Sequence, residues 1–104
     1  MSGEPEVIDD KEQSRYEVRI DGETAAIADY VKQPGTISFT HTETFPGHKG
    51  EGLAGRMIER ALRDAQAEKL AVIPFCSYVS HYIGQHEEFR ALVPEDRQAE
   101  FDLS

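Results

Sequence analysis

The chain has 104 residues and a formal net charge of −9 at pH 7, with 38% hydrophobic and 30% charged residues. This length suits one domain with a modest core, the apolar runs are too short to cross a membrane, and the acidic balance disfavours non-specific nucleic-acid binding. Residues 1–10 lack the hydrophobic stretch of a signal peptide and the single cysteine permits no internal disulfide, so we expect a cytoplasmic protein.

Much of the excess negative charge lies at the two ends of the chain. We expect residues 1–13 to form a disordered acidic leader, residues 14–94 a single domain, and residues 95–104 an acidic tail. Charge runs of this kind are usually solvated surface. An alternative is that the acidic surface attracts a cationic amine.

Three segments in the first half of the chain are expected to be strands. Arg15–Ile20 alternates hydrophobic and charged residues, and the hairpin signal Asp21-Gly22 leads to a return strand at Thr24–Lys32. A second turn at Gln33-Pro34-Gly35 precedes another alternating segment, Thr36–Glu43. These elements predict an antiparallel meander.

A helix from about Gly52 to Glu68 is the clearest element of the sequence. Its hydrophobic residues recur at helical spacing and form one stripe: Leu53, Ala54, Met57, Ile58, Ala61, Leu62 and Ala65. The next strand, Leu70–Phe75, does not alternate and should be buried on both faces. A strand–helix–strand crossover implies that this strand pairs in parallel with Thr36–Glu43.

Shorter helical segments should complete the domain. Ser77 is a plausible N-cap for a helix over about Tyr78 to Gln85. A short helical turn is expected from Glu87 to Leu92, ended by Pro94. The sequence thus predicts an α+β fold.

A glycine-rich segment lies between the third strand and the long helix. Within nine residues it contains four glycines: Gly47, Gly50, Gly52 and Gly55. Glycine allows the backbone to adopt positive φ and to approach a ligand closely, and the free N–H groups of the next helix face an anion. The arrangement predicts a site for a phosphate-bearing cofactor.

The spacing Gly50-x-Gly52-x-x-Gly55 also matches the dinucleotide fingerprint. That fingerprint requires a second parallel strand followed by an acidic residue for the ribose. Here the second strand ends in Cys76-Ser77-Tyr78, without a carboxylate. A nicotinamide-dependent oxidoreductase is therefore disfavoured.

The segment Lys49-Gly50-Glu51-Gly52-Leu53-Ala54 resembles the pyrophosphate loop of GNAT-type N-acetyltransferases, although Lys49 stands where Gln or Arg is usual. Further motifs resemble a subgroup of very small GNAT-like proteins: His41-Thr42 before the loop, Pro74-Phe75-Cys76 after the next strand, and His86-Glu87-Glu88-Phe89. The resemblance covers about residues 15 to 93. It implies the minimal GNAT fold, a mixed and mostly antiparallel sheet with a strand–glycine loop–helix–strand crossover, in which two parallel strands splay apart.

The resemblance also implies residues that bind acetyl-CoA or CoA. They are the loop and the first helical turn: Lys49, Gly50, Glu51, Gly52, Leu53, Ala54, Gly55 and Arg56. The backbone amides of the loop would hold the pyrophosphate, and Lys49 or Arg56 could pair with a phosphate. No metal site is expected, because the histidines are scattered and lack zinc spacing.

Three residues are candidates for catalysis. Cys76 follows a buried strand and precedes a helix, where a thiol can be reactive, although a free cysteine is commonly an apolar filler. His41 could act as a base, or could be a structural residue of the strand. Glu43 is a second candidate base on the same face of the strand as His41.

The function implied by the resemblance is transfer of an acetyl group from acetyl-CoA to an amine of a small molecule, a peptide or a protein. Only short turns connect the early strands, so the acceptor side should be open, as suits a protein or peptide amine. The alternative is a non-catalytic module that binds CoA or acyl-CoA. No membrane or nucleic-acid partner is expected.

Overall fold

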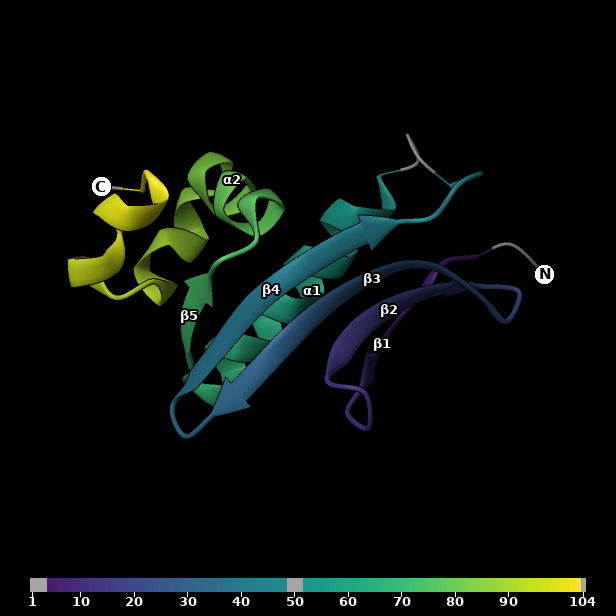
Figure 1. Cartoon of the computed structure of the whole chain (residues 1–104), viewed down its shortest axis with the longest axis horizontal. Helices are drawn as coiled ribbons and strands as arrows, with labels where there is room; N and C mark the ends of the chain where they lie inside the picture. The colour runs from purple at the N-terminus through teal and green to yellow at the C-terminus, as the bar shows by residue number, and fades with distance from the viewer. Residues whose placement is uncertain (1–3, 49–51, 104) are drawn as a thin grey trace.

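In the computed structural model, which describes residues 4–48 and 52–103, the chain forms a five-stranded sheet with a long helix across one face (Figure 1). The strands lie in chain order, and neighbours are antiparallel except for the parallel pair β4 and β5. They are β1 (Glu6–Asp10), β2 (Arg15–Ile20), β3 (Glu23–Gln33), β4 (Thr36–Thr44) and β5 (Ala71–Pro74). The expected α+β fold, with its mixed and mostly antiparallel sheet and its strand–loop–helix–strand crossover, is confirmed.

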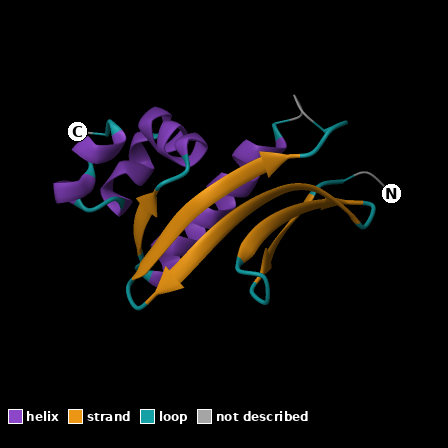
Figure 2. Cartoon of the chain, viewed as in Figure 1, coloured by secondary structure: helices purple, strands orange, loops and turns teal. Residues whose placement is uncertain are grey.

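Helical segments lie behind the sheet and beyond the end of β5 (Figure 2). They are α1 (Leu53–Glu68), α2 (Ser77–Gln85) and three short 3-10 segments, η1 (Glu87–Leu92), η2 (Glu95–Arg97) and η3 (Ala99–Phe101). No helix within residues 4–48 and 52–103 is both long and apolar enough to span a membrane.

The core lies between α1 and the sheet. All seven residues of the expected apolar stripe on α1 are buried. On β3, the small side chains of Ala26 and Ala28 are buried against the helix and allow the two layers to approach closely. Phe39 of β4 and Val72 of β5 extend this core to the parallel strand pair.

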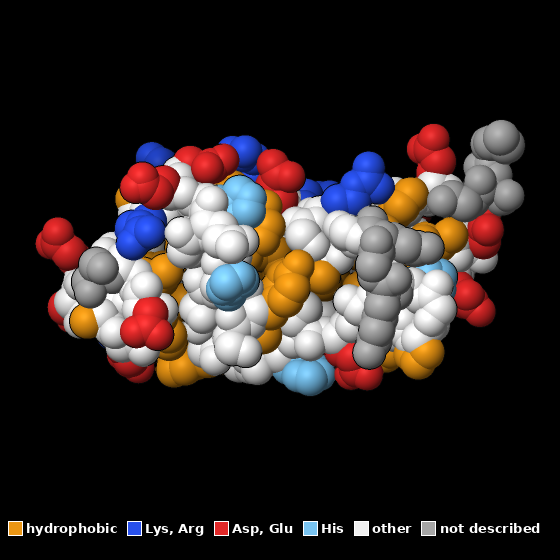
Figure 3. All heavy atoms as spheres, turned by 90° about the horizontal axis from the view of Figure 1, so that it is seen from above, with side chains coloured by type: hydrophobic (Ala, Val, Ile, Leu, Met, Phe, Trp, Pro, Cys, Tyr) orange, Lys and Arg blue, Asp and Glu red, His pale blue; other side chains and the backbone are white. Residues whose placement is uncertain are grey.

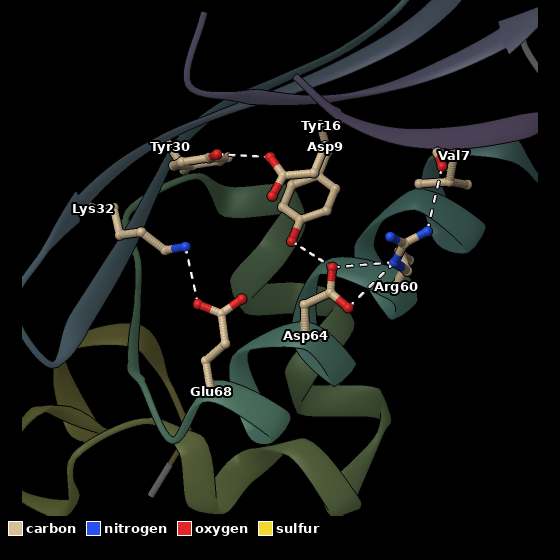
Figure 4. A network of polar contacts seen from close by, with 8 residues as sticks. All are labelled: Val7, Asp9, Tyr16, Tyr30, Lys32, Arg60, Asp64 and Glu68. Carbon is tan, nitrogen blue, oxygen red and sulfur yellow. Dashed lines mark hydrogen bonds and ion pairs between the residues drawn. The ribbon is translucent and has the colours of Figure 1, made fainter. Parts of the chain in front are cut away.

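Two buried tyrosines bond carboxylates through their hydroxyl groups, one between the sheet and α1 and the other between two strands of the sheet (Figure 4). Tyr16 of β2 donates a hydrogen bond to Asp64 of α1 at 2.7 Å, and Tyr30 of β3 donates one to Asp9 of β1 at 2.7 Å. Arg60 bonds the same Asp64 carboxylate at 3.1 Å. Burial, followed by the hydrogen-bonded carboxylates, raises the pKa of both tyrosines above the ordinary value. Each phenol therefore stays a neutral donor, and the tilt of α1 on the sheet is held by directed bonds.

The expectation of a disordered leader is wrong for residues 6–10, which form β1. This strand pairs with β2, from Glu6 opposite Arg19 to Asp10 opposite Arg15. Its inward side is fastened to the domain: Val7 packs on the core and its carbonyl accepts a bond from Arg60 at 3.3 Å. The sequence did not predict this strand because most of its residues are charged and only one of the residues that face the core is apolar.

The expectation of a solvated C-terminal tail is also wrong for the described part of residues 95–104. The chain there folds back as η2 and η3, and Leu103 is only 1% exposed within the core cluster. Arg90 donates hydrogen bonds to the carbonyls of Leu103 and Gly84, and Gln98 donates one to the carbonyl of Val93 at 3.0 Å. The acidic residues face solvent while the final turn completes the core.

The packing of Leu103 predicts that Leu103→Ala lowers the free energy of unfolding by about 2–5 kcal/mol, because a fully buried leucine leaves a cavity. Urea denaturation measures this value. The matched control is Glu95→Ala, an exposed change in the same segment, for which we expect a change within about 0.5 kcal/mol. Equal effects of the two substitutions would contradict the packed C-terminal segment.

The tyrosine bonds predict loss of stability at high pH. The unfolded chain loses its phenolic protons near pH 10, whereas folded Tyr16 and Tyr30 keep theirs to higher pH. The stabilisation is therefore fully present below pH 10 and is lost as the pH rises above it, by up to about 1.4 kcal/mol per pH unit for each tyrosine. Tyr16→Phe should reduce the loss of unfolding free energy per pH unit, measured by urea denaturation between pH 9 and 11. An unchanged loss would refute the role of the Tyr16 hydroxyl in this pH dependence.

Candidate functional site

The candidate site lies where β4 and β5 stop pairing. The last pair of the ladder is Phe39 opposite Pro74, after which β5 ends and β4 continues to Thr44. The backbone N–H of Cys76 still bonds the carbonyl of Phe39 at 2.9 Å, and the chain then turns into α2. Figure 1 shows the two strands diverging towards the start of α2. The splayed parallel pair that the family resemblance implied is therefore present.

A β-bulge in β4 decides which side chains face this gap. The register with β3 passes from Phe39 opposite Tyr30 to His41 opposite Asp29, so Thr40 is an extra residue. An extra residue reverses the alternation of side chains along a strand. As a result Thr42 and Thr44, opposite the buried Ala28 and Ala26, turn to the α1 face.

A cleft of about 460 Å³ opens between the end of β4, the start of α1 and the start of α2. This volume lies within the range of small-molecule sites. Its lining residues are Thr42, Glu43, Thr44, His48, Gly52, Leu53, Ala54 and Tyr78. Hydrophobic side chains gather near the middle of the face that carries α2 and the end of β4 (Figure 3).

The start of α1 forms one end of the cleft. Gly52, the N-cap, has φ 72° and no side-chain hydrogen bond caps this end of the helix. The first turn has no acidic residue, so its free N–H groups are left to attract an anion. Among the described residues no hydrogen bond or ion pair involves the exposed guanidinium of Arg56. These features fit a phosphate group.

The other predicted cofactor-binding residues occupy different positions. Leu53 and Ala54 line the cleft, but their side chains are buried, so they offer backbone groups. Gly55 faces α2: a Cβ there would lie 3.8 Å from the Tyr82 ring. This is an ordinary contact distance, so the packing of α1 on α2 leaves room for a Cβ at this position. Lys49, Gly50 and Glu51 lie outside the described residues.

Cys76 follows the end of β5 and contacts Thr42, which lines the cleft. It is half-buried, it is the N-cap residue of α2 in place of the expected Ser77, and its thiol donates to Thr42 Oγ1 at 3.2 Å. This bond joins the end of the β5 segment to β4 across the gap between the strands. The position combines a thiol, a hydroxyl and the free N–H groups of a helix start.

His41 and Glu43 lie on the opposite face of β4 from Thr42. Their side chains are 57% and 50% exposed, and His41 Nε2 is 3.3 Å from Glu43 Oε1. The expectation that both share one strand face is confirmed. However, the bulge separates them from Cys76, so the three predicted catalytic residues do not form one contact cluster.

Two tyrosines of α2 lie near Gly55 in the first turns of α1. Tyr78 lines the cleft and is 42% exposed, and its hydroxyl lies near Gly55 of α1. Burial, and after it the carboxylates of Glu59 and Glu88, raises the pKa of Tyr82. Both rings lie where α2 meets α1, close to the start of the long helix.

Sequence reasoning did not identify the threonines that line the cleft. Thr42 was part of the His41-Thr42 motif, but its role beside Cys76 depends on the bulge. Thr44 had no signal apart from its position at the end of a strand. A regular two-residue alternation from Phe39 would have turned His41 and Glu43, rather than Thr42 and Thr44, towards α1.

Comparison with known families provides independent information. A family described as GCN5-related N-acetyl-transferase matches residues 15–92, which include the parallel strand pair, the loop, α1 and α2. No curated protein shows significant similarity to the chain.

Proposed function

Because the chain belongs to the GCN5-related N-acetyltransferase family, we propose that it binds acetyl-CoA in the cleft and transfers the acetyl group to an amine. The observation that supports this most is the cleft itself, which joins an uncapped helix start to the gap between β4 and β5. The start of α1 suits the pyrophosphate of CoA. The gap between the strands suits its uncharged pantetheine arm.

The pyrophosphate would lie at the start of α1. There no side chain caps the backbone N–H groups of the first turn, and glycine at position 52 leaves the approach open, since a Cβ there would meet no atom within 4 Å. Arg56 can add a charge-assisted bond. By sequence, Lys49 to Glu51 complete this loop.

The pantetheine arm would run along the free edge of β4. Along a strand, the backbone N–H and C=O groups of successive residues point alternately towards the neighbour on one side and the neighbour on the other. Phe45 N–H bonds β3 at Ala25, so the backbone groups of Thr44 and Thr42 face the other side, where the ladder with β5 has already ended. These groups can bond an amide-containing arm as a neighbouring strand would.

Acetyl-CoA would supply the acetyl thioester, and the chain would position it and manage the protons. His41 and Glu43 form a hydrogen-bonded pair that can accept the proton of an amine arriving from the uncovered side of β4. Backbone N–H groups beside the gap can stabilise the oxyanion. The Cys76 thiol or the Tyr78 hydroxyl can return a proton to the departing sulfur.

The alternative function is a module that binds CoA without transfer. The separation of Cys76 from the His41–Glu43 pair favours this alternative, because among the described residues no hydrogen bond joins the thiol to either side chain of the pair. The short turns at Gly22 and Gly35 also leave the acceptor side without extra walls. Turnover measurements decide between the two functions.

Acetyl-CoA should raise the melting temperature of the protein in a concentration-dependent manner, whereas NAD should not. Gly52→Val should abolish this shift, because a branched side chain at positive φ distorts the helix start and obstructs the phosphate. Gly22→Val is the matched control, since Gly22 also has positive φ but lies in a distant hairpin turn. Each substitution should destabilise by about 1–2 kcal/mol. Stabilisation by NAD alone would refute the proposal.

Measurements of kcat should show which of the candidate residues take part in catalysis. If the His41–Glu43 pair is the base, His41→Ala should lower kcat about 100-fold while acetyl-CoA binding is kept. Cys76→Ala should lower kcat in the same assay if the thiol takes part, and wild-type turnover of this variant would return Cys76 to a structural role. Tight acetyl-CoA binding without turnover on any amine, peptide or protein would favour the binding module.

A further inference from the structure

A contact between two side chains lies where the cleft meets the splay point of β4 and β5. Along β4 the cleft is lined by Thr44, Glu43 and finally Thr42, so it stops at Thr42. Cys76 is not part of the lining; it lies behind Thr42 and donates its thiol hydrogen to Thr42 Oγ1 at 3.2 Å. The Thr42–Cys76 pair is therefore the end wall.

This wall is held in place by the backbone on both sides. Cys76 N–H bonds Phe39 carbonyl at 2.9 Å, which continues the β4–β5 ladder by one bond beyond the last strand pair. Thr42 is fixed opposite Ala28 in the ladder with β3. The backbone at both positions is therefore fixed by strand contacts.

The space around the splay point is filled. Phe39, Val72 and Val79 belong to one core cluster and are each no more than 1% exposed. Close-packed interiors accept additional methylene groups poorly. A group at this end of the cleft is therefore limited in length unless the wall is removed.

We propose that the Thr42–Cys76 pair sets the length of the acyl group, so that the cleft accepts acetyl and rejects longer acyl chains. This inference rests on the proposed binding of acyl-CoA. The thioester end would reach Thr42 because Thr42 and Gly52, at the proposed phosphate site, line the same cleft. Thr42 and Cys76 are then specificity-determining residues, whatever part the thiol takes in transfer.

Direct binding tests the proposal without any turnover. Dissociation constants of CoA, acetyl-CoA, propionyl-CoA, butyryl-CoA and hexanoyl-CoA are measured by titration calorimetry with the full chain. For the wild type we expect similar affinities for CoA and acetyl-CoA, and a loss of about tenfold or more for each added methylene. Thr42→Ala and Cys76→Ala should each bring the affinity for butyryl-CoA to within about threefold of that for acetyl-CoA.

Three further variants separate the wall from general effects on the cleft. Thr44→Ala shortens another lining side chain on the same strand and should leave the length limit unchanged. Cys76→Ser keeps a donor to Thr42 and should keep the limit. Thr42→Val keeps the volume of the wall and tests the hydrogen bond alone; we expect a limit weakened less than by Thr42→Ala.

The outcomes distinguish this inference from the function on which it rests. If CoA does not bind, both the proposed function and the inference are overturned. If CoA and acetyl-CoA bind but wild type binds butyryl-CoA equally well, the inference alone is wrong. The same holds if folded Thr42→Ala and Cys76→Ala keep the wild-type limit, with folding verified by thermal melts.

Discussion

The early end of β5 beside the longer β4 is the constraint on which the rest of the site depends. Strand pairing stops at Phe39 and Pro74, and proline at this last position removes a backbone donor. The backbone groups of β4 beyond this point cannot pair with β5, and in water they need other partners. A strand edge of this kind, beside two helix starts, suits a ligand that carries its own amide groups.

The relative position of the two ends of the cleft is maintained by α1. The helix begins at the proposed phosphate site and lies across the sheet, so its tilt places that site relative to Thr42. The Tyr16–Asp64 bond connects the helix to β2, and the Arg60–Val7 bond connects it to β1. Hydrophobic packing alone is non-directional. Directed bonds of this kind favour one orientation among the many that would bury a similar area.

Charge is distributed to serve solubility more than attraction of the proposed ligand. A net charge of −9 repels an anionic cofactor at long range. Binding must therefore depend on local groups, namely the start of α1 and the cations close to it. The same acidic character protects an exposed edge, because Glu6, Asp9 and Asp10 on β1 disfavour pairing with a second copy. At the other edge, β5 has only four residues.

The sequence by itself determined the elements with strong local periodicity. The apolar stripe of α1 has a 3.6-residue repeat that only a helix can bury on one side, and the buried stripe is the one expected. Likewise, β2 has the expected limits, and the crossover required the parallel pairing that β4 and β5 show. The glycine-rich segment indicated where a phosphate could bind, because free N–H groups at a helix start are a local property.

Tertiary structure alone decided the features that depend on long-range contacts. The strand Glu6–Asp10 and the burial of Leu103 arise from partners far along the chain, and charged neighbours hide them in the sequence. The bulge at Thr40 is set by pairing with β3, and it exchanged the faces of His41 and Thr42. A sequence shows that strand residues alternate, but an extra residue in one strand is defined only by its partner. For this reason the sequence could nominate Cys76 and His41, while only the folded sheet showed that Cys76 contacts Thr42 and that His41 lies on the other side.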